Sequence, residues 1–278
     1  MDSGQSMQQR QEKVNKAMSR IRHKLAVMSG KGGVGKSTVA ANLAISLQNR
    51  GFEVGLLDAD MHGPTIPKML GAENVKLGVV GEGIMPATVL SGLKVVSIGF
   101  LLADTDTPVI WRGPMKMGAI SQFLGEVAWD ELDCLIVDLP PGTGDEPLSI
   151  AQLVPAMDGS IIVTTPQEVA LTSVRKCINF SKSLDIPVLG IIENMSGFTC
   201  PHCGRRIEIF GTGGGEQAAK ELGLPFLGRM SLHPKIVESG ESGTPFVLDQ
   251  GETPAVGEFK VIVDNIVKTI GEERGTSS

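Results

Sequence analysis

The chain has 278 residues, 41% of them hydrophobic, which is enough for a substantial core and within the range of one α/β unit. Its net charge of −6, from 25 Lys and Arg against 31 Asp and Glu, argues against a global basic surface for nucleic acid. Tyrosine is absent and aromatic residues make up 4%, so few rings are available to stack on bases. We therefore expect no nucleic-acid partner.

Four cysteines, at positions 134, 177, 200 and 203, are too few and too unevenly spaced for a disulfide framework, which indicates a reducing compartment. The first residues are polar and charged and lack the apolar segment of a signal peptide. No apolar run reaches the ~18 residues that a membrane-spanning helix needs. The expected protein is cytoplasmic and has no membrane partner.

Residues 1–23 are expected to form a flexible polar leader, helical in part, and residues 24–278 a single domain with a C-x-x-C insertion near 196–214. Strands are predicted at 25–29, 53–58, 93–99, 133–138, 160–164, 187–193 and, more briefly, 225–227. Helices are predicted at 35–49, 115–124, 169–184, 215–222 and 254–270. Continuous apolar strands that alternate with helices favour an α/β fold with a mostly parallel central sheet and helices on both faces.

The segment Gly-Lys-Gly-Gly-Val-Gly-Lys-Ser at 30–37 matches the phosphate-loop pattern G-x-x-x-x-G-K-[ST], between a predicted strand and a predicted helix. Glycines let backbone N–H groups turn toward phosphate oxygens, and a helix N-terminus adds positive potential. We expect Lys36 to reach the β- and γ-phosphates of ATP, Ser37 to bind Mg²⁺ and Thr38 to reach the α-phosphate. The residues expected to bind the nucleotide are Gly30, Lys31, Gly32, Gly33, Val34, Gly35, Lys36, Ser37 and Thr38.

A second lysine, Lys31, lies inside this loop. The pattern over 30–38 resembles the deviant Walker A motif of the MinD/ParA/Mrp/nitrogenase-iron-protein class of P-loop NTPases, in which the extra lysine crosses a dimer interface to the partner's phosphates. The resemblance implies a nucleotide-linked homodimer. The sequence leaves open the alternative that Lys31 is an exposed side chain with no partner.

Acidic residues end two of the predicted strands, Asp58 and Asp60 after one and Asp138 after another. Carboxylates at the C-terminal ends of parallel strands face the ligand crevice of an open α/β sheet. Asp138 is predicted to be the Walker B acid, acting on Mg²⁺ through a water, and Asp60 to orient the attacking water or to contact Mg²⁺, while Asp58 supports the loop from below. The predicted catalytic residues are therefore Lys31, Lys36, Asp60 and Asp138.

Cys200-Pro201-His202-Cys203 is the second chemical signal, because a C-x-x-C segment places two thiolates within reach of one metal. A redox pair, half of a zinc site and a coincidence all stay open. Cys134 and Cys177 fall in a predicted strand and a predicted helix, where ordinary packing explains them. Two chains related by a two-fold axis would supply four thiolates, which suits a [4Fe–4S] cluster or tetrahedral Zn²⁺.

Taken together, these motifs resemble the Mrp/ApbC/Nbp family of iron–sulfur cluster carrier ATPases over about residues 24–252. The segments that carry the resemblance are 30–38, Asp-Ala-Asp-Met-His-Gly-Pro at 58–64, Trp-Arg-Gly-Pro-Met at 111–115, Asp-Leu-Pro-Pro-Gly-Thr-Gly-Asp at 138–145, Glu-Asn-Met-Ser at 193–196 and Cys-Pro-His-Cys at 200–203.

That resemblance implies a labile [4Fe–4S] cluster bridged between two subunits by Cys200 and Cys203 and passed to apo iron–sulfur proteins, with zinc as a substitute metal. It also implies slow ATP hydrolysis linked to transfer, and contact of Asn194 with the adenine. Some relatives carry a further N-terminal cluster of cysteines, whereas this chain has no cysteine before Cys134.

Two other functions stay open. A positioning ATPase like MinD or ParA would bind a membrane or DNA and would need a basic amphipathic C-terminal helix or a basic patch. The last helical stretch, 258–273, has mixed charge and is expected to dock on the domain instead. A zinc-stapled regulatory ATPase without a cluster is the third possibility.

Overall fold

The computed structural model describes residues 2–61, 63–81, 83–101, 113–200, 202–249 and 253–271. The main sheet contains β1 (Ile21–Met28), β2 (Val54–Asp58), β5 (Ala87–Val89), β6 (Leu93–Ser97), β7 (Leu132–Asp138), β8 (Gly159–Thr164), β9 (Val188–Glu193) and β12 (Phe226–Arg229). Their order is β12-β9-β8-β1-β7-β2-β6-β5, and neighbouring strands are parallel except β5 with β6. The central strands are buried along nearly their whole length, as their continuous apolar sequences predict.

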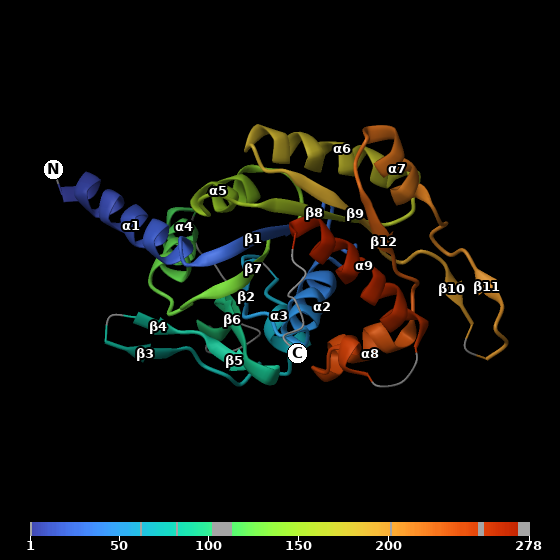
Figure 1. Ribbon diagram of the computed structural model, residues 1–278, viewed down its shortest axis with the longest axis horizontal. Helices are drawn as coiled ribbons and strands as arrows, with labels where there is room; N and C mark the ends of the chain where they lie inside the picture. The colour runs from blue at the N-terminus through green and yellow to red at the C-terminus, as the bar shows by residue number, and fades with distance from the viewer. Residues whose placement is uncertain are drawn as a thin grey trace.

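Helices cover both faces of this sheet (Figure 1). One face carries α1 (Asp2–Met18), α4 (Gly113–Gly125), α5 (Asp145–Leu153), α6 (Glu168–Ser183) and α7 (Gly214–Leu222). The other carries α2 (Lys36–Gln48), α3 (Ile66–Met69), α8 (Pro234–Ser242) and α9 (Pro254–Ile270). Each face has its own apolar core, so the predicted α/β architecture with a mostly parallel, doubly covered sheet is confirmed.

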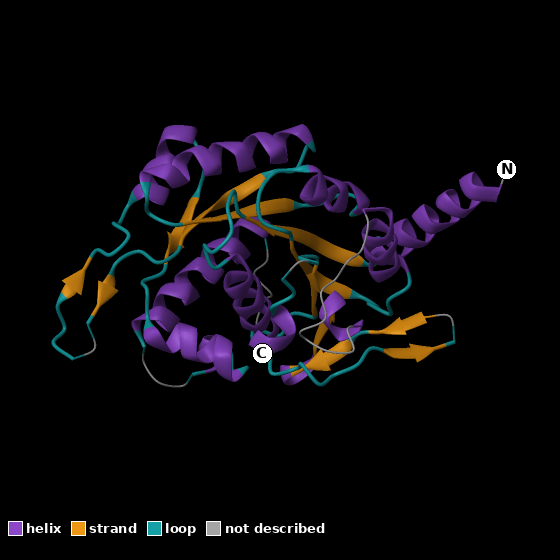
Figure 2. Cartoon of the chain, turned by 180° about the vertical axis from the view of Figure 1, so that it is seen from behind, coloured by secondary structure: helices purple, strands orange, loops and turns teal. Residues whose placement is uncertain are grey.

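Two small antiparallel ribbons project from opposite ends of the molecule (Figures 1 and 2). One consists of β3 (Gly78–Val80) and β4 (Gly83–Met85), and the other of β10 (Phe198–Thr199) and β11 (Arg206–Ile207). The second ribbon carries the C-x-x-C segment, and we call residues 198–211 the cysteine ribbon. Both fall in stretches for which the sequence predicted no regular structure.

The expectation of a flexible leader through residue 23 is wrong for its second half. Val14 and Met18 are fully buried on the side of α1 that packs against α4, and β1 already begins at Ile21. The physical reason is the i, i+4 spacing of Val14 and Met18, which gives a polar helix one apolar contact face. A Cβ at Gly125 would lie 3.0 Å from the backbone nitrogen of Val14, so α1 approaches α4 closely.

The C-terminal helix α9 docks on the domain, as expected. Phe259, Ile262, Val263 and Ile266 are buried between α9 and the sheet. The helix begins at Pro254 and is followed by Gly271 at φ +82°, which are the residue types favoured at these two ends. Of the helices in the described part of the chain, none combines the length and the apolar character needed to cross a bilayer.

Candidate functional site

Three chain segments meet at the C-terminal edge of the sheet because β1, β7 and β2 are neighbours. The phosphate loop follows β1, Asp138 ends β7 and Asp58 ends β2. The strand registers place Asp138 opposite Val27 on one side and opposite Asp58 on the other. Backbone pairing between strands therefore places Asp138 beside Val27 and Asp58, which lie far from it in the sequence.

The glycines of the loop are required by close contacts as well as by backbone conformation. Gly35 has φ +83°, and a Cβ there would lie 2.2 Å from Nδ2 of Asn194. A Cβ at Gly30 would lie 2.5 Å from Ser173 in α6. The Asn194 Nδ2 donates a hydrogen bond of 2.8 Å to the carbonyl oxygen of Val34, so the loop rests on Asn194.

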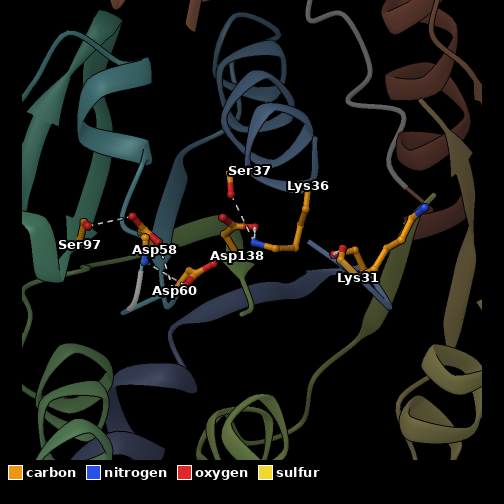
Figure 3. A network of polar contacts seen from close by, with 9 residues as sticks. Lys31, Lys36, Ser37, Asp58, Asp60, Ser97 and Asp138 are labelled. Carbon is orange, nitrogen blue, oxygen red and sulfur yellow. Dashed lines mark hydrogen bonds and ion pairs between the residues drawn. The ribbon is translucent and has the colours of Figure 1, made fainter. Parts of the chain in front are cut away.

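Lys36 and Asp138 form the centre of the site (Figure 3). Nζ of Lys36 lies 2.6 Å from Oδ1 of Asp138 and 3.3 Å from the Ser37 hydroxyl. Asp138 is fully buried, and burial raises the pKa of its carboxyl although the Lys36 ammonium opposes that rise. Its second oxygen, Oδ2, accepts no hydrogen bond from any residue within the described ranges. An acceptor left unsatisfied in this way is suited to a ligand at this position.

Two more carboxylates lie beside Asp138. Asp58 accepts a hydrogen bond of 2.9 Å from the Ser97 hydroxyl, and burial together with the nearby Asp138 raises the pKa of Asp58 to about 8. The carboxylate of Asp60 points toward Asp138 (Figure 3), while its backbone N–H donates to Asp58. The sequence did not single out Ser97, which lies inside the strand predicted at 93–99 and ends the observed β6 opposite Asp58.

The oxygen atoms of Ser37 and Asp138 are the kind of donor that Mg²⁺ prefers, the Asp60 carboxylate lies next to them (Figure 3), and Lys36 adds a cation for phosphate. A cavity of about 320 Å³ opens beside this cluster and is lined by Gly35, Thr38, Asn194 and Met195 together with residues of α3 and α8. That volume is at the lower end of small-molecule sites. The residues present therefore fit a metal–nucleotide complex.

Lys31 does not join this cluster. Its side chain extends away from Lys36 (Figure 3), and its Nζ donates a hydrogen bond of 3.1 Å to Oε1 of Gln167. In this conformation Lys36, and not Lys31, lies at the phosphate position of its own chain. Its assignment to a partner's phosphates stays a prediction.

Cys200 and Cys203 lie at the tip of the cysteine ribbon, between β10 and β11. The backbone N–H of Cys200 donates to the carbonyl of Arg205 and that of Gly204 to the carbonyl of Cys200, with Gly204 at φ +70°. The Cys203 side chain is exposed and that of Cys200 is partly exposed. Backbone N–H groups of Cys203 and His202 lower the pKa of the Cys200 thiol, which favours a metal-binding thiolate.

The other two cysteines lie elsewhere. Cys134 and Cys177 are buried in the core, and burial raises the pKa of Cys177 to about 12. Within the described ranges, no three His, Cys, Asp or Glu side chains are placed to hold one metal. The described part of one chain therefore offers the cysteine ribbon's two thiols as a pair without further ligands.

The sequence reasoning also missed Glu193, which ends β9 as Asp58 and Asp138 end their strands. Its side chain is fully buried and accepts hydrogen bonds from residues at both ends of the cysteine ribbon. Other segments of the resemblance lie outside the described residues, namely His62, Trp111, Arg112 and Pro201.

Known proteins share both the sequence and the fold. Two relatives named iron-sulfur cluster carrier protein are 54% and 50% identical: one from Methanocaldococcus jannaschii, covering 97% of this chain and 92% of that protein, and one from Saccharolobus solfataricus, covering 93% and 87%. A solved nucleotide-binding protein from Archaeoglobus fulgidus, in complex with ADP, superposes with a TM-score of 0.75 at 41% identity, covering 84% of this chain and 91% of that one.

More distant structures share the fold alone. The cell division ATPase MinD from Pyrococcus furiosus superposes with a TM-score of 0.61 at 22% identity, covering 88% of this chain and 98% of that one. The model of the NUBPL iron-transfer P-loop NTPase family matches residues 20–267. With the phosphate loop, the acids of β2 and β7 and these relatives in agreement, the chain belongs to the NUBPL iron-transfer P-loop NTPase family.

Proposed function

We propose that this chain is an ATP-hydrolysing carrier of iron–sulfur clusters, located in the cytoplasm, which assembles a [4Fe–4S] cluster between two copies of itself and passes it to apo-proteins. The observation that carries the proposal is the pair of the partly exposed Cys200 and the exposed Cys203, which has no third metal-binding side chain beside it in the described structure. Four thiolates are the usual ligand set of such a cluster, so two chains are needed to supply them. The names of the relatives support the same cargo.

Nucleotide binding follows from the first site. Lys36 and the N–H groups of the loop neutralise the β- and γ-phosphates, Ser37 and Asp138 hold Mg²⁺, and Asp60 orients the attacking water. Asn194 contributes to the adenine side of the cavity next to Gly35. Lys31, which already points out of its own loop, reaches the phosphates of the second chain in the dimer.

The alternative of a positioning ATPase has less support. The apolar face of α9 is buried against the domain and is not available to a membrane surface. The likeness to MinD at 22% identity concerns the fold and carries no argument about a membrane or DNA. The zinc-stapled regulatory ATPase differs from the carrier only in what the cysteine ribbon holds, so metal analysis separates them.

The test is transfer of a cluster. The chain is reconstituted anaerobically with iron and sulfide, freed of unbound ions, and mixed with an apo-enzyme whose activity requires a [4Fe–4S] cluster. We expect the apo-enzyme to regain activity in the presence of Mg²⁺ and ATP, and the variant Cys200→Ala/Cys203→Ala to give none. Stoichiometric zinc without sulfide, or a cluster that stays on the chain under all conditions, would refute the carrier function.

A further inference from the structure

The cysteine ribbon is joined to the domain through a narrow neck. The chain leaves the domain at Ser196 and returns at Thr212, and the hydroxyls of these residues are 2.9 Å apart. The backbone N–H of Ser196 also donates to the carbonyl of Met230, next to β12. A further backbone contact joins Gly197 and Phe198 to Leu232, so residues 196–198 and 212 together set the direction of the ribbon that carries Cys200 and Cys203.

Glu193 links the two chain segments of this neck through hydrogen bonds. One carboxylate oxygen accepts hydrogen bonds from the Ser196 hydroxyl at 2.5 Å and from the Gly213 N–H at 2.8 Å. The other accepts a bond of 2.6 Å from the N–H of Gly215, in the first turn of α7. Glu193 is fully buried, and the ion pairs found among the described residues do not include it, so neutral donors at the start of a helix offset its charge.

The next residue, Asn194, contacts the phosphate loop. Its Nδ2 donates to the carbonyl of Val34 and lies where a Cβ of Gly35 would be, so loop and side chain are in direct contact. Its backbone N–H donates to the carbonyl of Thr164 at the end of β8. Asn194 is therefore one of the residues in direct contact with the phosphate loop.

The backbone between these two contacts is strained. Met195, between Asn194 and Ser196, has φ +60°, a left-handed conformation that is unfavourable for a residue with a side chain and that clusters at switch regions. Met195 also lines the cavity beside Gly35 and Thr38. The strained residue is thus placed where a bound nucleotide would touch it.

We propose that Glu193 is the positioning residue of the cysteine ribbon and that the segment Glu193–Ser196 transmits the state of the phosphate loop to Cys200 and Cys203. This inference rests on the proposed function, because it gives the route by which nucleotide binding changes the release of the cargo. Phosphate in the loop displaces the Val34 carbonyl, and Asn194 moves with it. The adjoining Glu193 and Ser196 then shift, which changes the hydrogen bonds that Glu193 accepts from Ser196 and Gly213 at the neck. The geometry supplies contacts at every step from the loop to the ribbon.

The variants follow from this geometry. Glu193→Gln keeps the size of the side chain but replaces one acceptor oxygen with an NH₂ group, so one of the N–H groups of Gly213 and Gly215 loses its partner. Ser196→Ala removes only the hydroxyl and is the milder change if Glu193→Gln does not fold. Ser181→Ala is the matched control, since its hydroxyl lies 2.9 Å from that of Ser160 in a buried pair away from the site.

The experiment is hydrogen exchange of the cluster-free protein, read by mass spectrometry over peptides that cover 198–211, with and without Mg²⁺ and a non-hydrolysable ATP analogue. In the wild type we expect the analogue to change the exchange rate of the ribbon by about tenfold. In Glu193→Gln and Ser196→Ala we expect faster exchange and a response below about twofold, with analogue affinity within about threefold of wild type. Ser181→Ala should respond like the wild type.

A wild-type ribbon that does not respond to the analogue, or a full response in both folded variants, overturns the inference. Because no cluster is present in this experiment, its outcome is independent of cargo identity. A ribbon that responds normally in a protein that never acquires iron and sulfide would refute the carrier function and leave the coupling intact.

Discussion

Nζ of Lys36 and Oδ1 of Asp138 form an ion pair of 2.6 Å in which both side chains are almost completely shielded from solvent. The phosphate-loop lysine is thus held by the acid at the end of β7. A phosphate that binds Lys36 must compete with Asp138 for the ammonium group. Once Lys36 contacts the phosphate, Oδ1 of Asp138 is free to bind Mg²⁺. A buried pair of this kind tolerates the loss of one partner poorly, because the other charge is left uncompensated.

Replacing this lysine is the first test. We expect Lys36→Ala to reduce ATP turnover at least about 100-fold, because the loop loses the cation that neutralises the transferred phosphoryl group. The free energy of unfolding should also fall by about 3 kcal/mol, because the buried carboxylate of Asp138 loses the cation that compensates its charge. Phosphate release and urea unfolding measure the two effects.

Lys24→Ala, which removes another buried lysine from an acid, is the matched control and should retain turnover. Unchanged turnover in Lys36→Ala would refute the nucleotide assignment.

The role of Asp60 is tested by separating binding from chemistry. Asp60→Ala should lower kcat by about 10- to 100-fold and leave the Kd for Mg²⁺–ATP within about threefold, since a group that orients water acts mainly in the transition state. Single-turnover kinetics and equilibrium titration measure the two quantities. Asp130→Ala serves as the control, because Asp130 is an exposed acid that pairs with Lys94 away from the site. Equal losses in kcat and affinity would move Asp60 from hydrolysis to binding.

The raised pKa of Asp58 predicts a pH dependence of stability. Without Mg²⁺ and nucleotide, the folded chain holds the Asp58 proton up to about pH 8, whereas the unfolded chain releases it near its ordinary value of 3.8. Because the unfolded state binds fewer protons between these values, the free energy of unfolding falls as pH rises from about 4 to about 8.

Asp58→Asn removes this contribution, so the variant should gain stability relative to the wild type over that range, by several kcal/mol as an order of magnitude. Urea unfolding at pH 5 and pH 8 measures the difference. A difference that is the same at both pH values would contradict the account.

Substitutions in the cysteine ribbon should affect metal binding and leave ATP hydrolysis nearly unchanged. We expect Cys200→Ala and Cys203→Ala to keep the fold and the ATPase rate within about twofold, since both thiols lie on a projecting ribbon, and to lose the brown chromophore after reconstitution. Absorbance near the charge-transfer bands and iron analysis provide the measurement. Cys177→Ala is the control that should keep the chromophore, because that thiol is buried in the core. A retained spectrum in either ribbon variant would point to other ligands.

Much of this fold could be predicted from the sequence because its strands are buried on both faces. The strands predicted to end at Asp58, Asp138 and Glu193 end at these residues in the structure and begin within one residue of the predicted position, and the carboxylates there follow from the same pattern. A strand that is buried on both faces is apolar along nearly its whole length, so it can be recognised from its own sequence. The parallel order of the strands then brings Asp58 and Asp138 together without any further signal.

The parts that were not predicted depend on contacts that one sequence does not display. Helix α1 looks polar, and its docking becomes visible only where Val14 and Met18 meet α4. Helix α8 has no fully buried residue, so its pattern gave no helical signal, although it lines the cavity through Ile236 and Val237. Glu193 could have been found from its position at the end of a strand, but its partners across the neck, Gly213 and Gly215, are about 20 residues away.

Native mass spectrometry of the anaerobically reconstituted protein tests whether two chains share one cluster through Cys200 and Cys203. We expect a species of two chains that carries four iron and four sulfide, and no such species from Cys200→Ala/Cys203→Ala. A single chain that carries the full four iron and four sulfide would refute the shared cluster.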